Sequence, residues 1–163
     1  MHDLKKIKIK KYDDSNKNQI IELILQIQTK EFNLPVSIKD QPDLEKIPEV
    51  YQKDNGNFWI ALDEEKVIGT IGLIDLGNNQ TAIKKMFLME KYRGTGISKM
   101  LLDVAIEFCK KNGIAEIYLG TTSSYLAAHR FYEKNGFLEI KKDIMPIAYD
   151  VHEVETKFYR YRF

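Results

Sequence analysis

The sequence predicts one mixed α/β domain spanning residues 1–163, and three observations lead to this prediction. The first half contains short apolar segments separated by turn residues, a pattern typical of an antiparallel meander. The second half alternates amphipathic helices with buried-type strands, which is typical of a β-α-β crossover with parallel strand pairing. No repeat, low-complexity stretch or linker interrupts the chain, so we expect both halves to share a single mixed sheet.

The composition predicts a soluble protein and argues against several classes of partner. The formal net charge is only +1, so we expect neither nucleic acid nor an anionic membrane as a partner. Residues 1–6 lack the apolar region of a signal peptide and no apolar run reaches transmembrane length, so a cytoplasmic location is expected. The single cysteine, Cys109, is interpreted as a packing residue, and the three histidines lack the spacing of metal ligands.

The elements of the first half follow from local signals. Residues 6–10 alternate lysine and isoleucine and predict an edge strand. The segment Asp14-Ser15-Asn16 is expected to cap a helix that buries one apolar face and ends before Pro35. The sequence then predicts a short helical segment and three strands, at residues 44–51, 58–62, 67–74 and 82–89.

The second half begins with a clear amphipathic helix. Residues 97–111 place apolar side chains on one stripe, and Gly113 ends the helix. A strand at 114–120, a helix capped by Ser123 or Ser124 that reaches Asn135, and a strand at 137–140 are expected to follow. The last predicted strand, within 154–163, is aromatic and basic. It is either an exposed edge that pairs with a second copy in a homodimer, or an interior strand.

The hexapeptide at 93–98, Arg-Gly-Thr-Gly-Ile-Ser, is the most informative motif because a strand precedes it and a helix follows it. The first N–H groups of a helix have no intrahelical partner, and the helix dipole adds a partial positive charge there. Glycines let a phosphate group approach the backbone closely. The hexapeptide therefore predicts an anion site, and the alternative is a glycine-rich turn that serves only the geometry of the chain.

A second motif makes the chain resemble the GNAT superfamily of N-acetyltransferases. The acyl-CoA signature of that superfamily, Arg/Gln-x-x-Gly-x-Gly/Ala, is matched by Arg93, Gly96 and Ser98, with serine replacing the last glycine or alanine. Residues 127–137, Ala-Ala-His-Arg-Phe-Tyr-Glu-Lys-Asn-Gly-Phe, resemble its alanine-rich helix that ends in Tyr-Glu-Lys-x-Gly-Phe. The resemblance covers essentially the whole chain and implies a mainly antiparallel sheet of six to seven strands flanked by about four helices.

The resemblance also implies acetyl-CoA as co-substrate, no metal ion, and roles for individual residues. The Leu88 N–H would stabilise the oxyanion of a tetrahedral intermediate, and Tyr132 would protonate the departing thiolate. Lys134 would reach the 3′-phosphate, and Tyr125 stands where relatives often carry an asparagine that binds the pantetheine amide. The residues expected to bind acetyl-CoA are Phe87, Leu88, Met89, Arg93, Gly94, Thr95, Gly96, Ile97, Ser98, Tyr125 and Lys134.

The sequence assigns neither the general base nor the acceptor. The strand at 82–89 carries Lys84 and Lys85 but no carboxylate. The loops at 32–36 and 145–149 are expected to select the acceptor, a small-molecule amine or a peptide. They lack an acidic cluster that would attract a polycation. Candidates for the base are Glu31, Asp75, Glu90 and His129, or a chain of water molecules.

Two functions therefore stay open, with a third disfavoured. The leading hypothesis is an N-acetyltransferase that works by direct attack in a ternary complex. The alternative is a non-catalytic acyl-CoA-binding sensor, which Ser98, Tyr125 and the missing strand carboxylate favour. A mononucleotide-binding protein would need an additional glycine before the loop at the spacing of a phosphate-binding motif, and the sequence lacks it.

Overall fold

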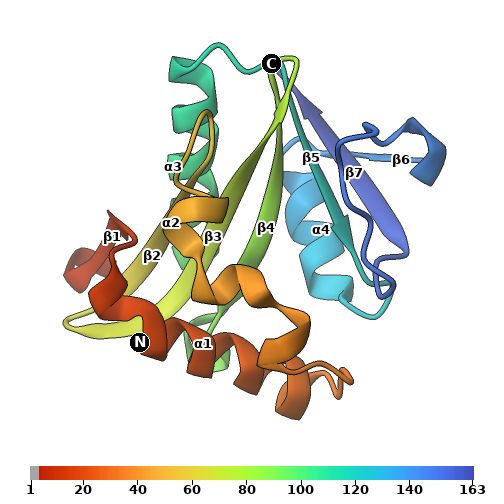
Figure 1. Ribbon diagram of the computed structural model, residues 1–163. Coiled ribbons are helices and arrows are strands. Elements are labelled where there is room, and N and C mark those ends of the chain that lie inside the picture. The colour runs from red at the N-terminus through yellow and green to blue at the C-terminus, as the bar shows by residue number, and fades with distance from the viewer. Residues whose placement is uncertain (1–3) are drawn as a thin grey trace.

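A computed structural model of the protein describes residues 4–163 (Figure 1). Within these residues, seven strands form one sheet in the order β1-β2-β3-β4-β5-β7-β6. The strands are β1 (Ile7–Lys11), β2 (Asn57–Asp63), β3 (Lys66–Gly77), β4 (Gln80–Leu88), β5 (Glu116–Thr121), β6 (Leu138–Ile140) and β7 (Lys157–Arg162). Neighbouring strands are antiparallel except β4 and β5, which are parallel. The predicted mixed, mainly antiparallel sheet is confirmed.

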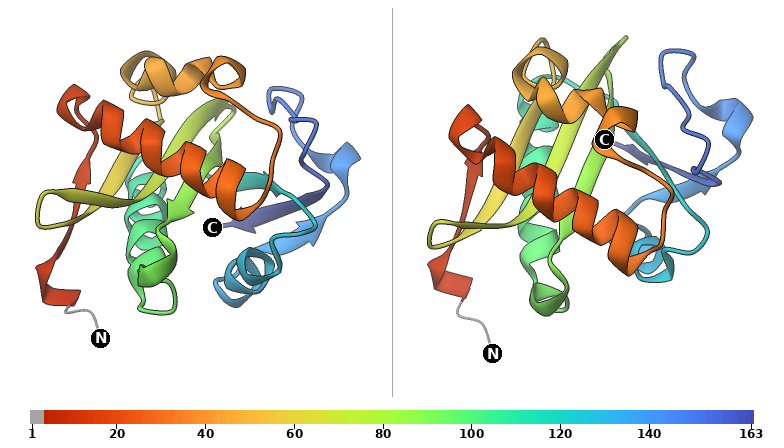
Figure 2. Two further views of the ribbon diagram at one scale, coloured as in Figure 1. Left: turned by 90° about the horizontal axis from the view of Figure 1, so that it is seen from below. Right: turned by 60° about the horizontal axis from the view of Figure 1, so that its bottom comes forward.

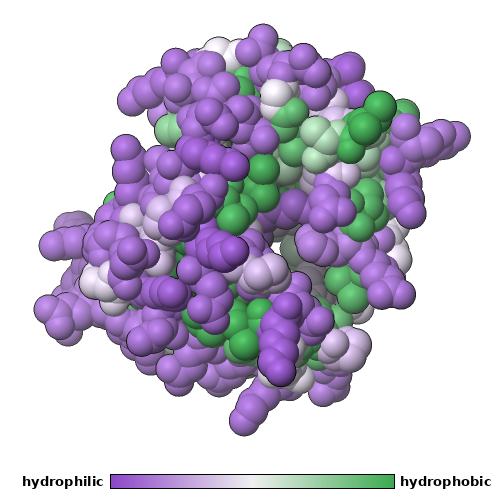
Figure 3. All heavy atoms as spheres, in the orientation of Figure 1, coloured by the Kyte–Doolittle hydropathy of each residue, from purple (hydrophilic) through white to green (hydrophobic). Residues whose placement is uncertain are grey.

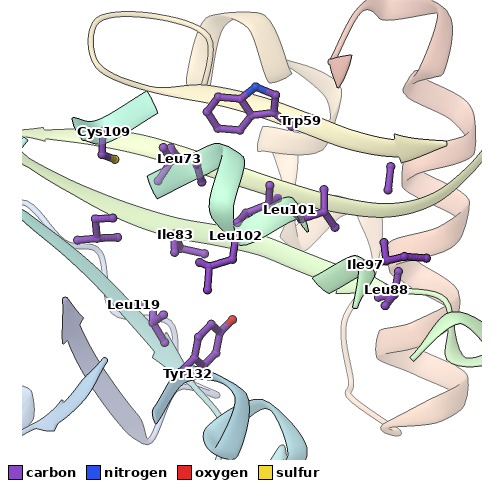
Figure 4. Packing of buried hydrophobic residues seen from close by; sticks show 14 of the residues in the cluster. Trp59, Leu73, Ile83, Leu88, Ile97, Leu101, Leu102, Cys109, Leu119 and Tyr132 are labelled. Atoms are coloured by element: carbon purple, nitrogen blue, oxygen red, sulfur yellow. The ribbon is translucent and has the colours of Figure 1, made fainter. Parts of the chain in front are cut away.

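Helices cover both faces of this sheet, as the two views in Figure 2 show. They are α1 (Lys17–Gln26), α2 (Ile47–Val50), α3 (Ile97–Lys111) and α4 (Leu126–Lys134), and a π-helical turn (Ile27–Glu31) continues α1. On the α3 and α4 face, one core contains Trp59, Leu101 and Tyr132 (Figure 4). On the α1 and α2 face, a second core contains Ile24 and Phe58. The amphipathic pattern of residues 97–111 thus predicts α3 correctly.

The sheet opens between its two central strands. The parallel pair β4 and β5 is bonded over only three positions, Gln80–Ala82 against Glu116–Tyr118. Beyond them, β4 stays paired with β3 as far as Leu88, while β5 stays paired with β7 as far as Thr121. The two strands consequently diverge along their length, which Figure 1 shows as a widening gap between the ribbons.

A β-bulge lies in β4 beside this opening. Gly72 pairs with Lys84 and Thr70 pairs with Phe87, so β4 holds one residue more than β3 between these pairs. Lys85 takes up the extra residue with a left-handed backbone, at φ 53°. The Thr70 hydroxyl donates to the Lys85 carbonyl oxygen at 2.6 Å, which stabilises the bulge. Bulges of this kind redirect side chains next to functional sites.

Neither of the two predicted helix caps forms a side-chain hydrogen bond at the start of its helix. Residues Asp14–Asn16 form a 3₁₀ turn capped by Asp13, and Asn16 makes no side-chain cap at the start of α1. Helix α4 begins at Leu126 instead of directly after Ser123 or Ser124. The backbone N–H of Ser123 donates to the Thr156 hydroxyl at 3.0 Å, which ties this segment to the chain leading into β7.

Other elements shift by a few residues or divide. The predicted helix at 44–51 divides into a 3₁₀ turn (Pro42–Glu45) and the single-turn helix α2. Strand β5 begins two residues later than predicted, and β7 is shorter than the predicted 154–163. Strand β7 lies between β5 and β6, so the interior alternative for the last strand is confirmed. No helix within residues 4–163 combines the length and the apolar character needed to cross a bilayer.

Candidate functional site

The loop between β4 and α3 presents backbone N–H groups at one point. Gly94 and Gly96 have φ angles of 75° and 95°, a left-handed conformation that glycine adopts without strain. The N–H of Met100 is bonded to the Gly96 carbonyl at 3.2 Å, which is the first hydrogen bond of α3. The N–H groups before it have no acceptor within the helix. A Cβ at Gly94 would meet no atom within 4 Å, so this part of the loop is open to a ligand.

The end of β4 directs a backbone N–H towards the opening of the sheet. The N–H of Met89 donates to the Ile68 carbonyl on β3 at 2.8 Å. Because backbone groups alternate in direction along a strand, the N–H of Leu88 points to the opposite side, from which β5 has diverged. The Leu88 side chain is buried beside Ile97 (Figure 4). Packing therefore fixes the position of the predicted oxyanion donor.

Arg93 connects three segments around this loop. Its Nε and Nη2 donate to the Leu88 carbonyl oxygen at 3.1 and 2.9 Å. The same guanidinium forms an ion pair with Glu31, with Nη2 2.9 Å from Oε2. The arginine thus fastens the end of β4 to the turn that follows α1. Its role in binding the pyrophosphate stays a prediction.

Tyr132 places a protonated hydroxyl beside β4. The side chain is buried in the core between the sheet and α4, and its hydroxyl lies 3.5 Å from the Met86 Sδ. Its ring packs edge-on against Phe137, with ring centroids 5.6 Å apart. Burial raises the pKa of Tyr132 far above the ordinary value of 10, so the phenol keeps its proton at neutral pH. This is the state that a proton donor requires.

Two predicted acetyl-CoA contacts, Tyr125 and Lys134, lie outside the segment that joins β4 to α3. The Tyr125 ring packs on Phe32, with centroids 4.3 Å apart, and so joins the β5–α4 segment to the segment after α1. Burial, reinforced by the charge of Glu31, raises the pKa of Tyr125 to about 12. Lys134 is exposed at the end of α4. Their roles towards acetyl-CoA stay predictions.

The candidates for the general base are scattered. Glu31 is engaged by Arg93, as described above. Asp75 accepts from the N–H of Gly77 at 3.0 Å in the β3–β4 hairpin, at the other end of β4 from Leu88. His129 is buried, with its Nε2 2.7 Å from the Thr122 carbonyl oxygen. None of these contacts points to a catalytic base.

Two buried lysines of β4 are functional candidates that the sequence did not reveal as such. The Lys84 Nζ lies 3.7 Å from the Glu155 Oε2 and 3.8 Å from the centroid of the Tyr149 ring. Its side chain is only 12% exposed. Burial lowers the pKa of Lys84, an effect that the charge of Glu155 opposes. The lysine therefore lies beneath the segment that connects β6 to β7.

Lys85 extends in the direction of the segment between α1 and α2. Its Nζ donates to the Gln41 Oε1 and lies 3.8 Å from the Asp43 Oδ2, and its side chain is 14% exposed. Burial lowers its pKa, and the Asp43 carboxylate opposes that shift. The signal in the sequence was two adjacent charges within an otherwise apolar strand. The sequence signal alone does not indicate which face of the sheet the two lysines occupy, because their contacts come from distant segments.

Comparison with known proteins matches these features to a family. The family model described as "Acetyltransferase (GNAT) family" matches residues 21–137. The chain is 37% identical over 102 residues to the N-acetylaspartate synthetase of Xenopus tropicalis, over 60% of this chain and 37% of that protein. It is 32% identical over 108 residues to human N-acetyltransferase 8B, over 63% of this chain and 48% of that protein. The match thus spans less than half of each of these relatives.

Solved structures match over their whole length. An acetyltransferase of the GNAT family from Staphylococcus aureus Mu50 is 44% identical, with a TM-score of 0.93 over 96% of this chain and 98% of that chain. An acetyltransferase from Streptococcus agalactiae 2603 is 30% identical, with a TM-score of 0.92 over 97% and 99%. A loop of helix N-terminal donors, an opened sheet and a buried tyrosine thus occur in a chain that the family model matches over most of its length. The chain belongs to the acetyltransferase (GNAT) family.

Proposed function

We propose that the protein transfers the acetyl group of acetyl-CoA to a primary amine. The observation that carries this proposal is the position of the Leu88 N–H at the opening between β4 and β5, at the same end of the sheet as the N-terminus of α3. Membership of the GNAT family and the names of the similar proteins support the same reaction.

The residues of the loop fit the anionic part of acetyl-CoA. The N–H groups of Gly94–Ser98 would receive the pyrophosphate at the N-terminus of α3, where the helix dipole favours negative charge. Phe87, Leu88 and Met89 would hold the pantetheine arm along the opened edge of β4. Bound acetyl-CoA would supply an activated thioester. The Leu88 N–H would donate a hydrogen bond to its carbonyl oxygen.

Every bond and proton of the proposed transfer is accounted for by the substrates, water and the residues of this chain. The amine nitrogen forms a bond to the carbonyl carbon, the carbon–sulfur bond breaks, and the nitrogen releases a proton to water. Tyr132 gives its proton to the departing sulfur and regains one from solvent. Direct attack is favoured because Cys109 is buried against Thr81, and burial raises the pKa of its thiol to about 11. An acyl-enzyme on that cysteine is therefore not proposed.

The acceptor that we propose is the amine of a small molecule or a peptide, and amino acids are the first class to test. The name of one relative, N-acetylaspartate synthetase, points to an amino acid as the acceptor of that protein. The two segments around Phe32 and around Tyr149, which pack on Tyr125 and on Lys84, would line the side from which an acceptor approaches.

The test is release of the coenzyme A thiol with a panel of amines, for the wild type and for Tyr132→Phe. We expect turnover of at least one amine by the wild type. The phenylalanine variant loses the proton donor but keeps the ring, so kcat should fall by a factor of about 10² to 10⁴. The affinity for acetyl-CoA, measured by calorimetry, should change by less than about threefold, since a hydroxyl that acts only in the transition state contributes little to binding.

Two results would contradict the proposal. Binding of acetyl-CoA without turnover of any amine would support the sensor hypothesis instead. An unchanged kcat in Tyr132→Phe would remove the tyrosine from the mechanism. Phe131→Leu serves as a control, because Phe131 is a partly buried neighbour in the same core and carries no proton to donate.

A further inference from the structure

The bulge in β4 places two successive lysines on the same face of the sheet. In a regular strand, neighbouring side chains point to opposite faces. Lys84 is paired with Gly72, and a Cβ at Gly72 would lie 2.9 Å from Tyr51 and Phe58, on the α2 face. Lys85 follows in the bulge, yet its ammonium also reaches the α2 side, where it bonds to Gln41. Two positive charges thus converge on one face at the centre of the sheet.

This position is adjacent to the proposed reaction centre. Lys85 directly precedes Met86, whose Sδ contacts the Tyr132 hydroxyl at 3.5 Å. Tyr149, which packs on Lys84, is close enough to Tyr132 for the two groups to interact electrostatically. Figure 3 views the molecule from this side and shows a hollow near its middle. The lysines therefore flank the space that an acceptor would enter.

Both ammonium groups keep unused hydrogen-bond donors. The Lys84 Nζ is buried and has no hydrogen-bond partner among the described residues, while its ion-pair partner Glu155 accepts from the Tyr149 hydroxyl at 2.8 Å. The Lys85 Nζ donates to Gln41, and the Asp43 carboxylate accepts from the Tyr51 hydroxyl at 2.5 Å. A buried donor without an acceptor costs free energy, which an additional acceptor would recover.

We propose that Lys85, together with the charge of Lys84, binds a carboxylate of the acceptor, so that the acceptor is an amine of the amino-acid class. This inference rests on the proposed acetyl transfer. The Lys85 ammonium supplies the direct, charge-assisted bonds, while Lys84 acts through space in a poorly solvated region. Asp43 and Glu155 stand beside the lysines and offer the complementary charge to the ammonium of a zwitterion.

The test compares acceptors that differ only in one carboxyl group. Alanine against alaninamide tests the α-carboxylate, and aspartate against asparagine tests a side-chain carboxylate. Each kcat/KM is corrected for the fraction of neutral amine at the assay pH. In the wild type, we expect the kcat/KM of the acid to exceed that of its amide by at least about tenfold in at least one pair. A factor of this size corresponds to the free energy of one charge-assisted hydrogen bond.

Four variants connect that preference to the lysines. Lys85→Met should remove most of the preference for the acid, chiefly by raising its KM, while the amide changes by less than about threefold. Lys84→Met should reduce the preference by a smaller factor. Lys85→Arg keeps the charge and should retain part of the preference. Lys110→Met, at an exposed position on α3, should leave both rates unchanged.

Equal rates on acid and amide in both wild-type pairs would overturn the inference while leaving acetyl transfer intact. A preference that survives in both Lys85→Met and Lys84→Met would also overturn it. Failure to acetylate any amine would contradict the proposed function itself. Calorimetry of both acid–amide pairs with the coenzyme A-bound protein then decides the role of the lysines, since equal binding of acid and amide in both pairs would refute it.

Discussion

At the scale of single residues, Arg93 illustrates how one side chain serves both structure and site. Its place in the glycine-rich motif predicts contact with a phosphate group. The structure shows its guanidinium bonded to the Leu88 carbonyl and paired with Glu31. Because Leu88 provides the proposed oxyanion donor, these bonds also position that donor. The same loop thereby links the proposed acetyl-CoA site to the turn after α1.

Substitutions at the two ends of this ion pair should have unequal effects. Arg93→Ala loses the bonds to the Leu88 carbonyl as well as the ion pair, so we expect the free energy of unfolding to fall by about 1–3 kcal/mol. Glu31→Ala loses only a partly exposed ion pair and should cost at most about 1 kcal/mol. Urea denaturation of both single variants and the double variant measures the difference. Equal losses in the two single variants would contradict this account.

At the scale of elements, the bulge of β4 sets the positions of side chains in the candidate site. It directs Lys85 to the same face as Lys84, and it precedes the segment that ends in Leu88. The Thr70 hydroxyl on β3 bonds to the Lys85 carbonyl, which the bulge has removed from regular pairing with β3. A neighbouring strand thus stabilises a left-handed residue that would otherwise be strained.

Thr70→Val tests this support, with Thr81→Val as its matched control. Both threonines are fully buried in central strands. Thr70 donates to a carbonyl at 2.6 Å, so its loss should reduce the free energy of unfolding by about 1–3 kcal/mol. The Thr81 hydroxyl has the Cys109 Sγ as its polar contact, a weak partner, so loss of this hydroxyl should cost less than about 1 kcal/mol.

Chemical denaturation gives both free energies, and kcat/KM provides a second readout. Thr70→Val should also lower kcat/KM, because the bulge orients Lys85 and Leu88. A stability loss for Thr81→Val as large as that for Thr70→Val would contradict the inference that the Thr70 hydroxyl stabilises the bulge.

At the scale of the whole molecule, the sheet is held together by packing on both faces while it opens at its centre. The core on the α3 and α4 face continues from β1 to β7 across the opening. The pairing of β4 with β5 is confined to Gln80–Ala82, so side-chain packing joins the two halves of the sheet beyond that point. A molecule built in this way gains stability from a ligand that bridges both halves.

Acetyl-CoA should therefore raise the melting temperature of the protein, whereas ATP should not. At about 100 times its Kd, a ligand adds about 2.7 kcal/mol, which corresponds to about 5–10 °C for a domain of this size. Thermal denaturation at matched concentrations of the two nucleotides is the measurement. The absence of any shift with acetyl-CoA would contradict the proposed site.

Two glycine variants test whether the rise in melting temperature with acetyl-CoA depends on the loop before α3. Gly94 and Gly113 have φ angles of 75° and 70°, and a Cβ at either position meets no atom within 4 Å. Alanine should introduce a similar strain of about 1–2 kcal/mol at both positions. Only Gly94→Ala should also reduce the shift with acetyl-CoA, because only that loop adjoins the N-terminus of α3.

The sequence by itself determined the elements whose signals are local. The stripe of residues 97–111 predicts α3 at its observed bounds, because helix periodicity and the flanking glycines act within a few residues. Two motifs predict the family and identify the loop that adjoins α3. Local signals failed for the cap of α4, because the backbone of Ser123 bonds to Thr156, a residue distant in sequence.

Only the tertiary structure decided which side chains meet at the site. The bulge depends on the register between β3 and β4, which no local pattern in β4 specifies. Lys84 acquires its partner Glu155, and Lys85 acquires its partners Gln41 and Asp43, from segments more than 40 positions away in the sequence. Burial and charge at such a place depend on long-range packing. The sequence therefore indicated acetyl-CoA as the acetyl donor, and only the fold brought together the charged groups that we propose for the acceptor.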